Sequence, residues 1–250
     1  MNVRRITPAI TVLTLLVVPS CKDDDARTLT LSHEEVAHMV ATAISESTSG
    51  FTVVLNNSIS KTDDIVEAHE TKTDCGFAED HSITSQNQPG ADHTFLYTHN
   101  YSYELSCGGT EPLHMNTEVK FEGEFDTPRL TSQHIGTINL MISALNDNNG
   151  SYHVTGEYLN DGVYESRVNT KSIGENVVSF SSTDIKVNKL TREITSGTAQ
   201  ASITGTLPDK RNFAGEASVT FRDKGIVVIN VRGLDFVLET ESGDLNSVSN

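Results

Sequence analysis

The chain has 250 residues, in which 34 Asp and Glu outnumber 18 Lys and Arg, giving a formal net charge of −16. An acidic surface repels phosphate backbones and anionic headgroups, so this balance argues against nucleic acid as a partner and against adsorption to an anionic membrane. The length is sufficient for one domain with a substantial hydrophobic core.

The first 20 residues have the features of a secretory signal. Arg4 and Arg5 form a positive n-region, and residues 6–18 form an apolar run that is shorter than the ~20 residues needed to span a bilayer. Cys21 follows Val18-Pro19-Ser20, and this boundary resembles a bacterial lipobox. The resemblance implies cleavage before Cys21 and lipid on its sulfur and amine. The alternative is an ordinary signal peptide with a chance cysteine.

A short charged run follows the expected lipidation site. Lys22-Asp23-Asp24-Asp25 is similar to the export signal of surface-displayed lipoproteins in Bacteroidetes-type bacteria. That similarity implies a lipid-anchored protein of the outer membrane, exposed on the cell surface, with the periplasmic face as the alternative. A solvated acidic tether, which any linker could have, is the plainer interpretation. We expect residues 21–30 to be a tether, 31–241 a single domain and 242–250 a polar tail.

Two cysteines remain once Cys21 is assigned to the lipid. Cys75 and Cys107 are an even pair in an oxidising compartment, so we predict a disulfide between them. Such a bond contributes about 3–4 kcal/mol to stability in the chain-entropy model. Two unpaired thiols are the alternative. A metal site needs more ligands than this pair supplies, and we expect no metal and no cofactor.

The segment after the tether predicts one helix at 33–48, packed on a sheet. Ser32 and Glu35 have capping-box spacing, and the Ser-rich run after Ile44 ends the pattern. Apolar residues recur on one face of this helix: Val36, Met39, Val40, Ala43 and Ile44. Phe51 to Leu55 is interpreted as a strand, and Asn56 to Gly90 as a polar loop.

From Ala91 onward the hydrophobic period is two, which is typical of half-buried strands. The first inner face consists of Phe95, Tyr97, His99, Tyr101, Tyr103, Leu105 and Cys107. Turns are predicted at Asp126-Thr127-Pro128, Asn146 to Gly150, Asn160-Asp161-Gly162 and Asp223-Lys224-Gly225. The fold prediction is mainly β: an antiparallel meander of about ten strands, as a curled or barrel-like sheet with one N-terminal helix.

No catalytic motif is apparent. Nucleophile elbows, zinc-binding H-E-x-x-H, phosphate loops and dinucleotide fingerprints are absent from the sequence. His33 and His38 diverge on the helix, and a site built across strands is less expected than scattered histidines; its candidates are His81, His93, His99 and His114. Phe95, Tyr97, Tyr101 and Tyr103 are expected in the core rather than on a ligand-stacking face. We therefore predict that the protein is not an enzyme.

Taken together, the chain resembles an uncharacterised family of Bacteroidetes lipoproteins. The resemblance rests on the lipobox with its acidic run, the capped helix, the Cys75/Cys107 pair and the segments Asp126-Thr127-Pro128-Arg129-Leu130 and Thr195-Ser196-Gly197-Thr198. It implies no activity. The expected function is a membrane-anchored binding or envelope-structural module with an unknown protein or small apolar ligand as partner. The alternatives are a hydrophobic-ligand carrier with a helix-capped cavity and, less favoured, a hydrolase using scattered carboxylates.

Overall fold

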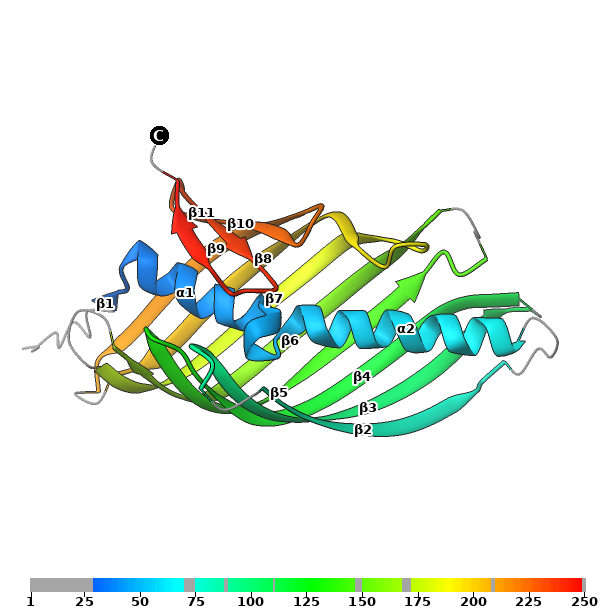
Figure 1. The fold of residues 1–250 in the computed structure, drawn as a ribbon, viewed down its shortest axis with the longest axis horizontal. Helices are drawn as coiled ribbons and strands as arrows, with labels where there is room; N and C mark the ends of the chain where they lie inside the picture. Colours follow the sequence, from blue (N-terminus) through cyan, green and yellow to red (C-terminus); the bar gives the residue numbers. More distant parts are fainter. Residues whose placement is uncertain are drawn as a thin grey trace, which may run out of the picture.

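The computed structural model describes residues 29–69, 75–87, 90–109, 111–146, 150–167, 172–207 and 210–248. Figure 1 shows a large antiparallel sheet with two helices laid end to end along one of its faces. The helical elements are α1 (His33–Ile44), η1 (Glu46–Thr48) and α2 (Phe51–His69). The strands are β1 (Leu29–Thr30), β2 (Ala78–Gln86), β3 (Thr94–Gly108), β4 (Glu111–Asp126), β5 (Leu130–Ser143), β6 (Ser151–Ser166), β7 (Ser172–Asn188), β8 (Ile194–Thr206), β9 (Asn212–Arg222), β10 (Ile226–Val231), β11 (Leu234–Glu239) and β12 (Leu245–Ser247).

The expected antiparallel meander is confirmed. Strands β2 to β12 are hydrogen-bonded neighbours in chain order, and β1 joins through a short parallel pair in which Leu29 lies opposite Phe213. The sheet is open rather than a closed barrel, because its two edge strands, β2 and β12, each pair with one described strand only. β12 lies within the segment expected to be a polar tail.

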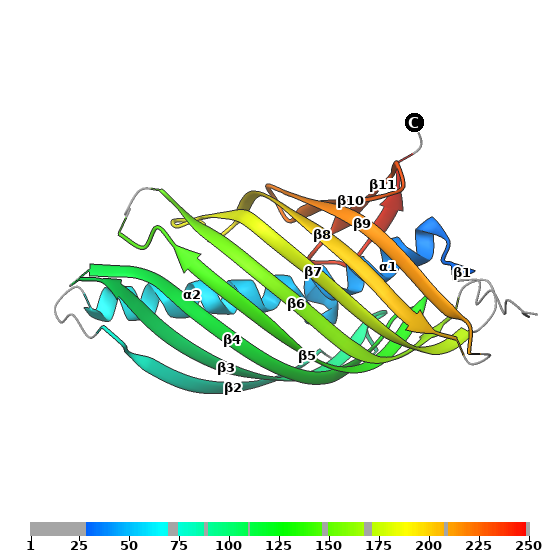
Figure 2. The same cartoon turned by 180° about the vertical axis from the view of Figure 1, so that it is seen from behind.

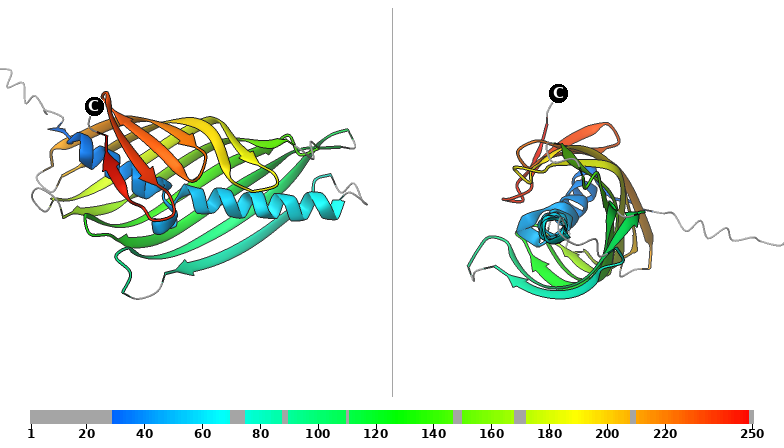
Figure 3. Two further views of the ribbon diagram at one scale, coloured as in Figure 1. Left: turned by 45° about the horizontal axis from the view of Figure 1, so that its top comes forward. Right: turned by 90° about the vertical axis from the view of Figure 1, so that its right-hand side faces the viewer.

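Both helices cover the same face of the sheet, which we call the covered face (Figure 3). Helix α1 lies against β7 to β11, and α2 lies against β4 and β5. The opposite face, seen toward the viewer in Figure 2, carries neither of these two helices and is called the open face. The turn between the helices contacts both edges of the sheet. Glu46 N donates to the carbonyl oxygen of Thr240, just after β11, at 2.8 Å, and the hydroxyls of Ser49 and of Ser85 on β2 are 3.2 Å apart.

Helix α1 begins as predicted. The Ser32 hydroxyl accepts from Glu35 N at 3.2 Å, and Glu35 accepts in turn from Ser32 N at 3.0 Å, which completes the capping box. Its buried stripe includes the five apolar residues expected from the sequence. The helical range predicted as 33–48 is divided, since α1 ends at Ile44 and the 3₁₀ turn η1 follows.

The second helix was not predicted, and both predictions for its sequence are wrong. Phe51 to Leu55 is not a strand but the start of α2, and the expected loop from Asn56 contains the rest of this helix and β2. Polar residues interrupt its apolar pattern: Ser58 and Thr62 are completely buried. Each hydroxyl donates to the carbonyl four residues earlier, so the helix itself satisfies the buried polar group.

One predicted turn is also wrong. Asn160, Asp161 and Gly162 lie inside β6, where they pair with β5 on one side and with β7 on the other. A two-residue turn of the predicted type needs positive φ, and none of these residues has it. The turns at Asp126-Thr127-Pro128 and Asp223-Lys224-Gly225 separate β4 from β5 and β9 from β10, as predicted.

The core lies between the helices and the covered face. Tyr97, Tyr101 and Tyr103 are buried there, as expected, while Phe95 is half-buried. The phenyl ring of Phe121 lies over Gly136 on the neighbouring strand, where a Cβ would overlap it. An aromatic ring thus fills the space that the missing side chain leaves.

Candidate functional site

The strands of the sheet have two ends, and different features lie at each of them. The chain enters at Leu29, beside the first residues of β9, and we call this the entry end. The ladder continues across β8, β7, β6, β5 and β4 to the end of β2 at Gln86, so the last residues of β2 and the first of β3 lie at the entry end. Cys75 and Cys107 lie at the opposite end, which we call the disulfide end.

A groove of about 550 Å³ crosses the open face at the entry end. Its floor follows one register row over four strands: Leu96 lies opposite Glu124, Glu124 opposite Gln133, and Gln133 opposite Val163. The Gln133 amide donates to the Glu124 carboxylate at 2.9 Å, which joins the middle of the row. One carboxylate, one amide and two aliphatic side chains, each from a different strand, therefore line a shallow, mixed surface and do not converge on a closed cavity.

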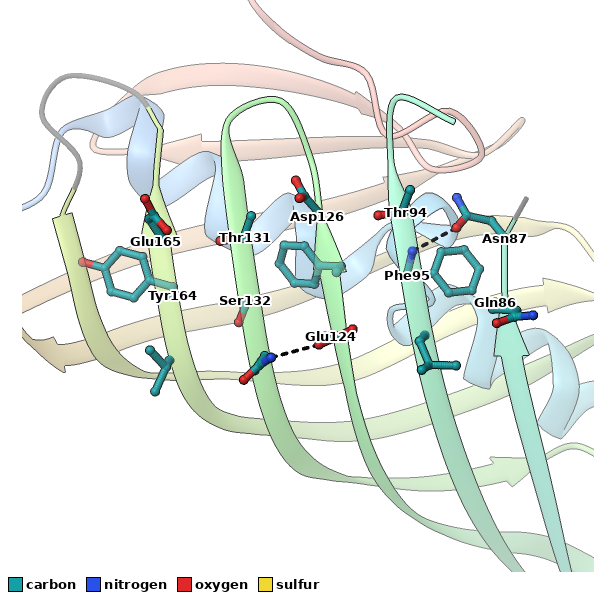
Figure 4. Close-up of a pocket in the computed structure, with 14 residues that line it drawn as sticks. Gln86, Asn87, Thr94, Phe95, Glu124, Asp126, Thr131, Ser132, Tyr164 and Glu165 are labelled. Atoms are coloured by element: carbon teal, nitrogen blue, oxygen red, sulfur yellow. Dashed lines mark hydrogen bonds between the residues drawn. The ribbon is translucent and has the colours of Figure 1, made fainter. Parts of the chain in front are cut away.

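The rim of the groove is held by local hydrogen bonds (Figure 4). Phe95 N donates to the Asn87 side chain at 2.9 Å, which fixes the turn between β2 and β3. Arg167 pairs with the Asp126 carboxylate at 2.7 Å. Glu165 on β6 and Asp126 on β4 lie toward the loops at the strand ends. These contacts give the rim a defined shape and leave it rich in acceptor oxygens.

Exposed aliphatic side chains continue the groove along the open face. Ile135 is 62% exposed, Val163 48%, Leu159 46% and Leu96 45%. Ile135 on β5 lies opposite Asp161, which lies between Leu159 and Val163 on β6. Ile135, Leu159 and Val163 are therefore neighbours on the open face. We call these four residues the open-face patch. Ile135, Leu159 and Val163 surround Asp161, and Leu96 lies at the other end of the row that contains Glu124 and Gln133. Exposed apolar side chains gathered on one face are a feature of interaction sites.

A separate polar cluster lies inside the covered face. His134 Nε2 is 2.7 Å from the Tyr97 hydroxyl, and its Nδ1 is 3.2 Å from the Ser132 hydroxyl. His99 stacks on Tyr97, with ring centroids 5.5 Å apart. Burial lowers the pKa of His134 to about 4, with a smaller contribution from His99, and burial lowers the pKa of His99 to about 4 as well.

This cluster contains a Ser–His contact, which is the geometry of an activated nucleophile. All its members are buried, however, and the Ser132 hydroxyl lies on the covered side of β5, although the residue borders the groove. A substrate in the groove has no path to it through the sheet. We interpret the cluster as a hydrogen-bonded part of the core.

Two carboxylates in the described part of the chain, Glu46 and Glu34, have shifted pKa values. Among the residues described, Glu46 is the carboxylate whose pKa is raised, by burial first and by Glu241 second. The pKa of Glu34 is lowered, chiefly by a hydrogen bond from Arg129. No group of three or more His, Cys, Asp or Glu in the described part of the chain is arranged to hold a metal ion.

The predicted site residues have different outcomes. Cys21 and the run Lys22-Asp23-Asp24-Asp25 lie outside the described residues. The Cys75–Cys107 disulfide is confirmed, with a Cα–Cα separation of 5.6 Å. It is less buried than the inner-face position of Cys107 suggested, since Cys107 is half-buried and Cys75 exposed. No helix among the described segments is both long and apolar enough to cross a membrane.

The groove, the open-face patch and His134 were not anticipated from the sequence. A signal was present for the patch, because Ile135, Leu159 and Val163 are apolar at positions that the period of two assigns to the wet face. The groove has no such signal, since it depends on the pairing of four strands. Comparison with family models, curated proteins and solved structures finds no match to this chain.

Proposed function

We propose that this protein is a non-enzymatic binding module, anchored by lipid at Cys21 to the bacterial outer membrane and exposed on the cell surface. The observation that carries the proposal is the groove with its adjoining open-face patch. The four exposed aliphatic side chains of the open-face patch, together with the Glu124 and Asp126 carboxylates of the groove, fit a partner that offers apolar and cationic groups. The breadth of the surface favours a protein as that partner.

The position of the groove agrees with a membrane-anchored role. Eight Cα–Cα steps separate Cys21 from Leu29, so the chain between them spans at most about 30 Å. Leu29 and the groove are both at the entry end. A lipid on Cys21 would keep the groove near the bilayer surface, and the disulfide end would then carry the more distant loops.

The carrier alternative is less well supported. Aliphatic and aromatic side chains fill the space between the helices and the covered face. The cavity described there, beside Met39 and Leu130, has a volume of about 20 Å³, which is close to one water molecule. A lipid would therefore require α1 to move away from the sheet.

The anchor and the open-face patch need separate tests. Cys21→Ala should move the protein from the membrane fraction to the soluble fraction and abolish its labelling with a fatty acid. For the open-face patch, a photo-cross-linking amino acid replaces Ile135 in the anchored protein in its own cells. The matched control places it at Leu190, which is 82% exposed but lies in the loop between β7 and β8.

A discrete adduct from position 135 that position 190 does not form supports the proposal. Equal adducts from both positions, or none from position 135, contradict binding at the open-face patch. Native mass spectrometry of the same purified protein tests the alternative: an added mass of a few hundred daltons, lost on denaturation, would favour the carrier.

A further inference from the structure

Among the described strands, β2 at one edge of the sheet pairs with β3 alone, so its other side carries no strand. β2 has nine residues and pairs with β3 without a register shift. Leu105 N donates to Phe77 O at 2.9 Å, and alternate residues of an antiparallel pair bond to the partner strand. His81 and Ile83 therefore bond to β3, while the backbone N–H and C=O groups of Asp80, Ser82 and Thr84 point away from the sheet.

Most of the usual features that protect such an edge are missing from β2. Natural sheets shorten their edge strands, bend them with bulges, or place Pro, Lys or an inward-facing charge on them. The opposite edge follows this rule, since β12 has only three residues. β2 contains no Pro and no Lys, and its inward-facing carboxylate, Glu79, is neutralised by Lys61 at 2.7 Å.

The surroundings of this edge are acidic. The sequence from Cys75 to Cys107 contains four carboxylates and no Lys or Arg. Asp80 and Glu104 are exposed on the open face of β2 and β3. A cationic strand would be attracted to this edge, whereas a second copy of this chain would bring the same negative charges to it.

We propose that the free edge of β2 takes up an extended, cationic segment of a partner protein as an additional strand of the sheet. The free backbone groups of Asp80, Ser82 and Thr84 would pair with the segment's main chain, which gives affinity without a sequence requirement. Lys and Arg of the segment would lie beside Asp80 and Glu104, which selects for positive charge. This surface is distinct from the open-face patch, so it does not depend on the function proposed above.

The test uses a defined probe and the full-length protein, produced with its own export signal and purified in detergent. The probe is a blocked, fluorescent nonapeptide that alternates Lys and Thr. Its first control carries Glu in place of Lys. Its second control has the same sequence and charge but is N-methylated at alternate residues on the face that would pair with β2, so that it cannot form the ladder.

We expect fluorescence anisotropy to detect the Lys peptide, with at least about tenfold weaker binding for both controls. Hydrogen exchange of the segment 78–86 should slow when the Lys peptide is added. Equal binding of the parent and N-methylated peptides would overturn the proposal, because it would mean attraction by charge alone. Slow exchange of 78–86 that depends on protein concentration without peptide would also overturn it, in favour of self-pairing.

A pair of variants tests the same point from the protein's side. Ser82→Pro removes an outward N–H and leaves the bonds of His81 and Ile83 to β3, a position where edge strands accept Pro. Ser82→Val keeps the N–H and loses the same side-chain hydrogen bond to Asn100. The proposal requires weaker binding, by about tenfold, in Ser82→Pro alone. Unchanged binding in a folded Ser82→Pro protein would refute it, and the N-methylated peptide decides the question if that variant does not fold.

Discussion

Acidification should destabilise this fold through two histidines that the core holds in the neutral form. His99 and His134 are 2% and 6% exposed, and they lie on the covered face beside Tyr97. The groups that face them are the Tyr97 and Ser132 hydroxyls, aromatic rings and the Ser49 backbone, whose hydrogen bond raises the pKa of His99 less than burial lowers it. Among the described residues, no carboxylate contributes to the pKa of either histidine. Burial accordingly lowers the pKa of each to about 4.

The direction of the effect follows from the difference between the folded and unfolded states. A histidine titrates near pH 6.5 when unfolded, so below that pH the unfolded chain binds a proton that the folded chain excludes. The contribution of the neutral histidines to the free energy of unfolding is fully present above about pH 6.5. It is lost progressively as the pH falls toward about 4, at about 1.4 kcal/mol per pH unit for each histidine. From about pH 6.5 to about pH 5 the pair contributes a loss of about 4 kcal/mol, a large part of a typical domain stability.

Urea unfolding at several pH values between about 7 and about 5 measures this slope. His134→Gln removes one of the two titrating groups, so the variant should lose stability less steeply, by about 1.4 kcal/mol per pH unit. His153→Gln is the matched control, since His153 is exposed on β6 and contacts Asp184. His38, whose pKa is also lowered, makes the stability fall further on acidification, and Glu46, whose pKa is raised, makes it rise. Both residues are present in all three proteins, so they do not change the difference between the slopes. An unchanged slope in His134→Gln would refute a neutral, buried His134.

Three further outcomes are expected. Gly136→Ala should cost about 1–3 kcal/mol in urea unfolding, because its Cβ would overlap the Phe121 ring and a backbone oxygen, whereas Gly108→Ala has space and should be near neutral; similar losses in both would contradict the packing account. Cys107→Ser should lower the unfolding free energy by about 3–4 kcal/mol, and reducing agent should then have no further effect on that variant. Arg129→Ala should cost less than about 1 kcal/mol because its ion pair is half-exposed, and it should raise the pKa of His38 in an NMR titration; a lowered pKa would exclude the charge effect.

The strand pattern could be predicted because it is local. Alternation of apolar and polar residues places side chains on opposite faces of a strand whatever the neighbouring strand is. Tyr97, Tyr101 and Tyr103 were assigned to the core in this way, and the structure buries all three. The capping box at Ser32 and Glu35 is equally local, since both partners lie within one helical turn.

Other features depended on groups that are distant in the sequence. Ser58 and Thr62 made α2 look like a loop, and only the sheet packed beneath them shows that their hydroxyls are buried and bonded within the helix. Asn160-Asp161-Gly162 has the composition of a turn, but β5 and β7 pair on both sides of it and hold it extended. In both cases tertiary packing outweighed a weak local preference.

By itself, the sequence determined the secondary-structure period, the start of α1, the pairing of Cys75 with Cys107 and the acidic character of the surface. Each depends on neighbouring residues, on composition or on the parity of the cysteines. Only the tertiary structure decided that both described helices lie on one face of the sheet, that Leu96 and Val163 face a common groove, and that β2 pairs with one described strand only. These properties depend on strand order and register, which arise when residues far apart in the chain pair and bury a shared core.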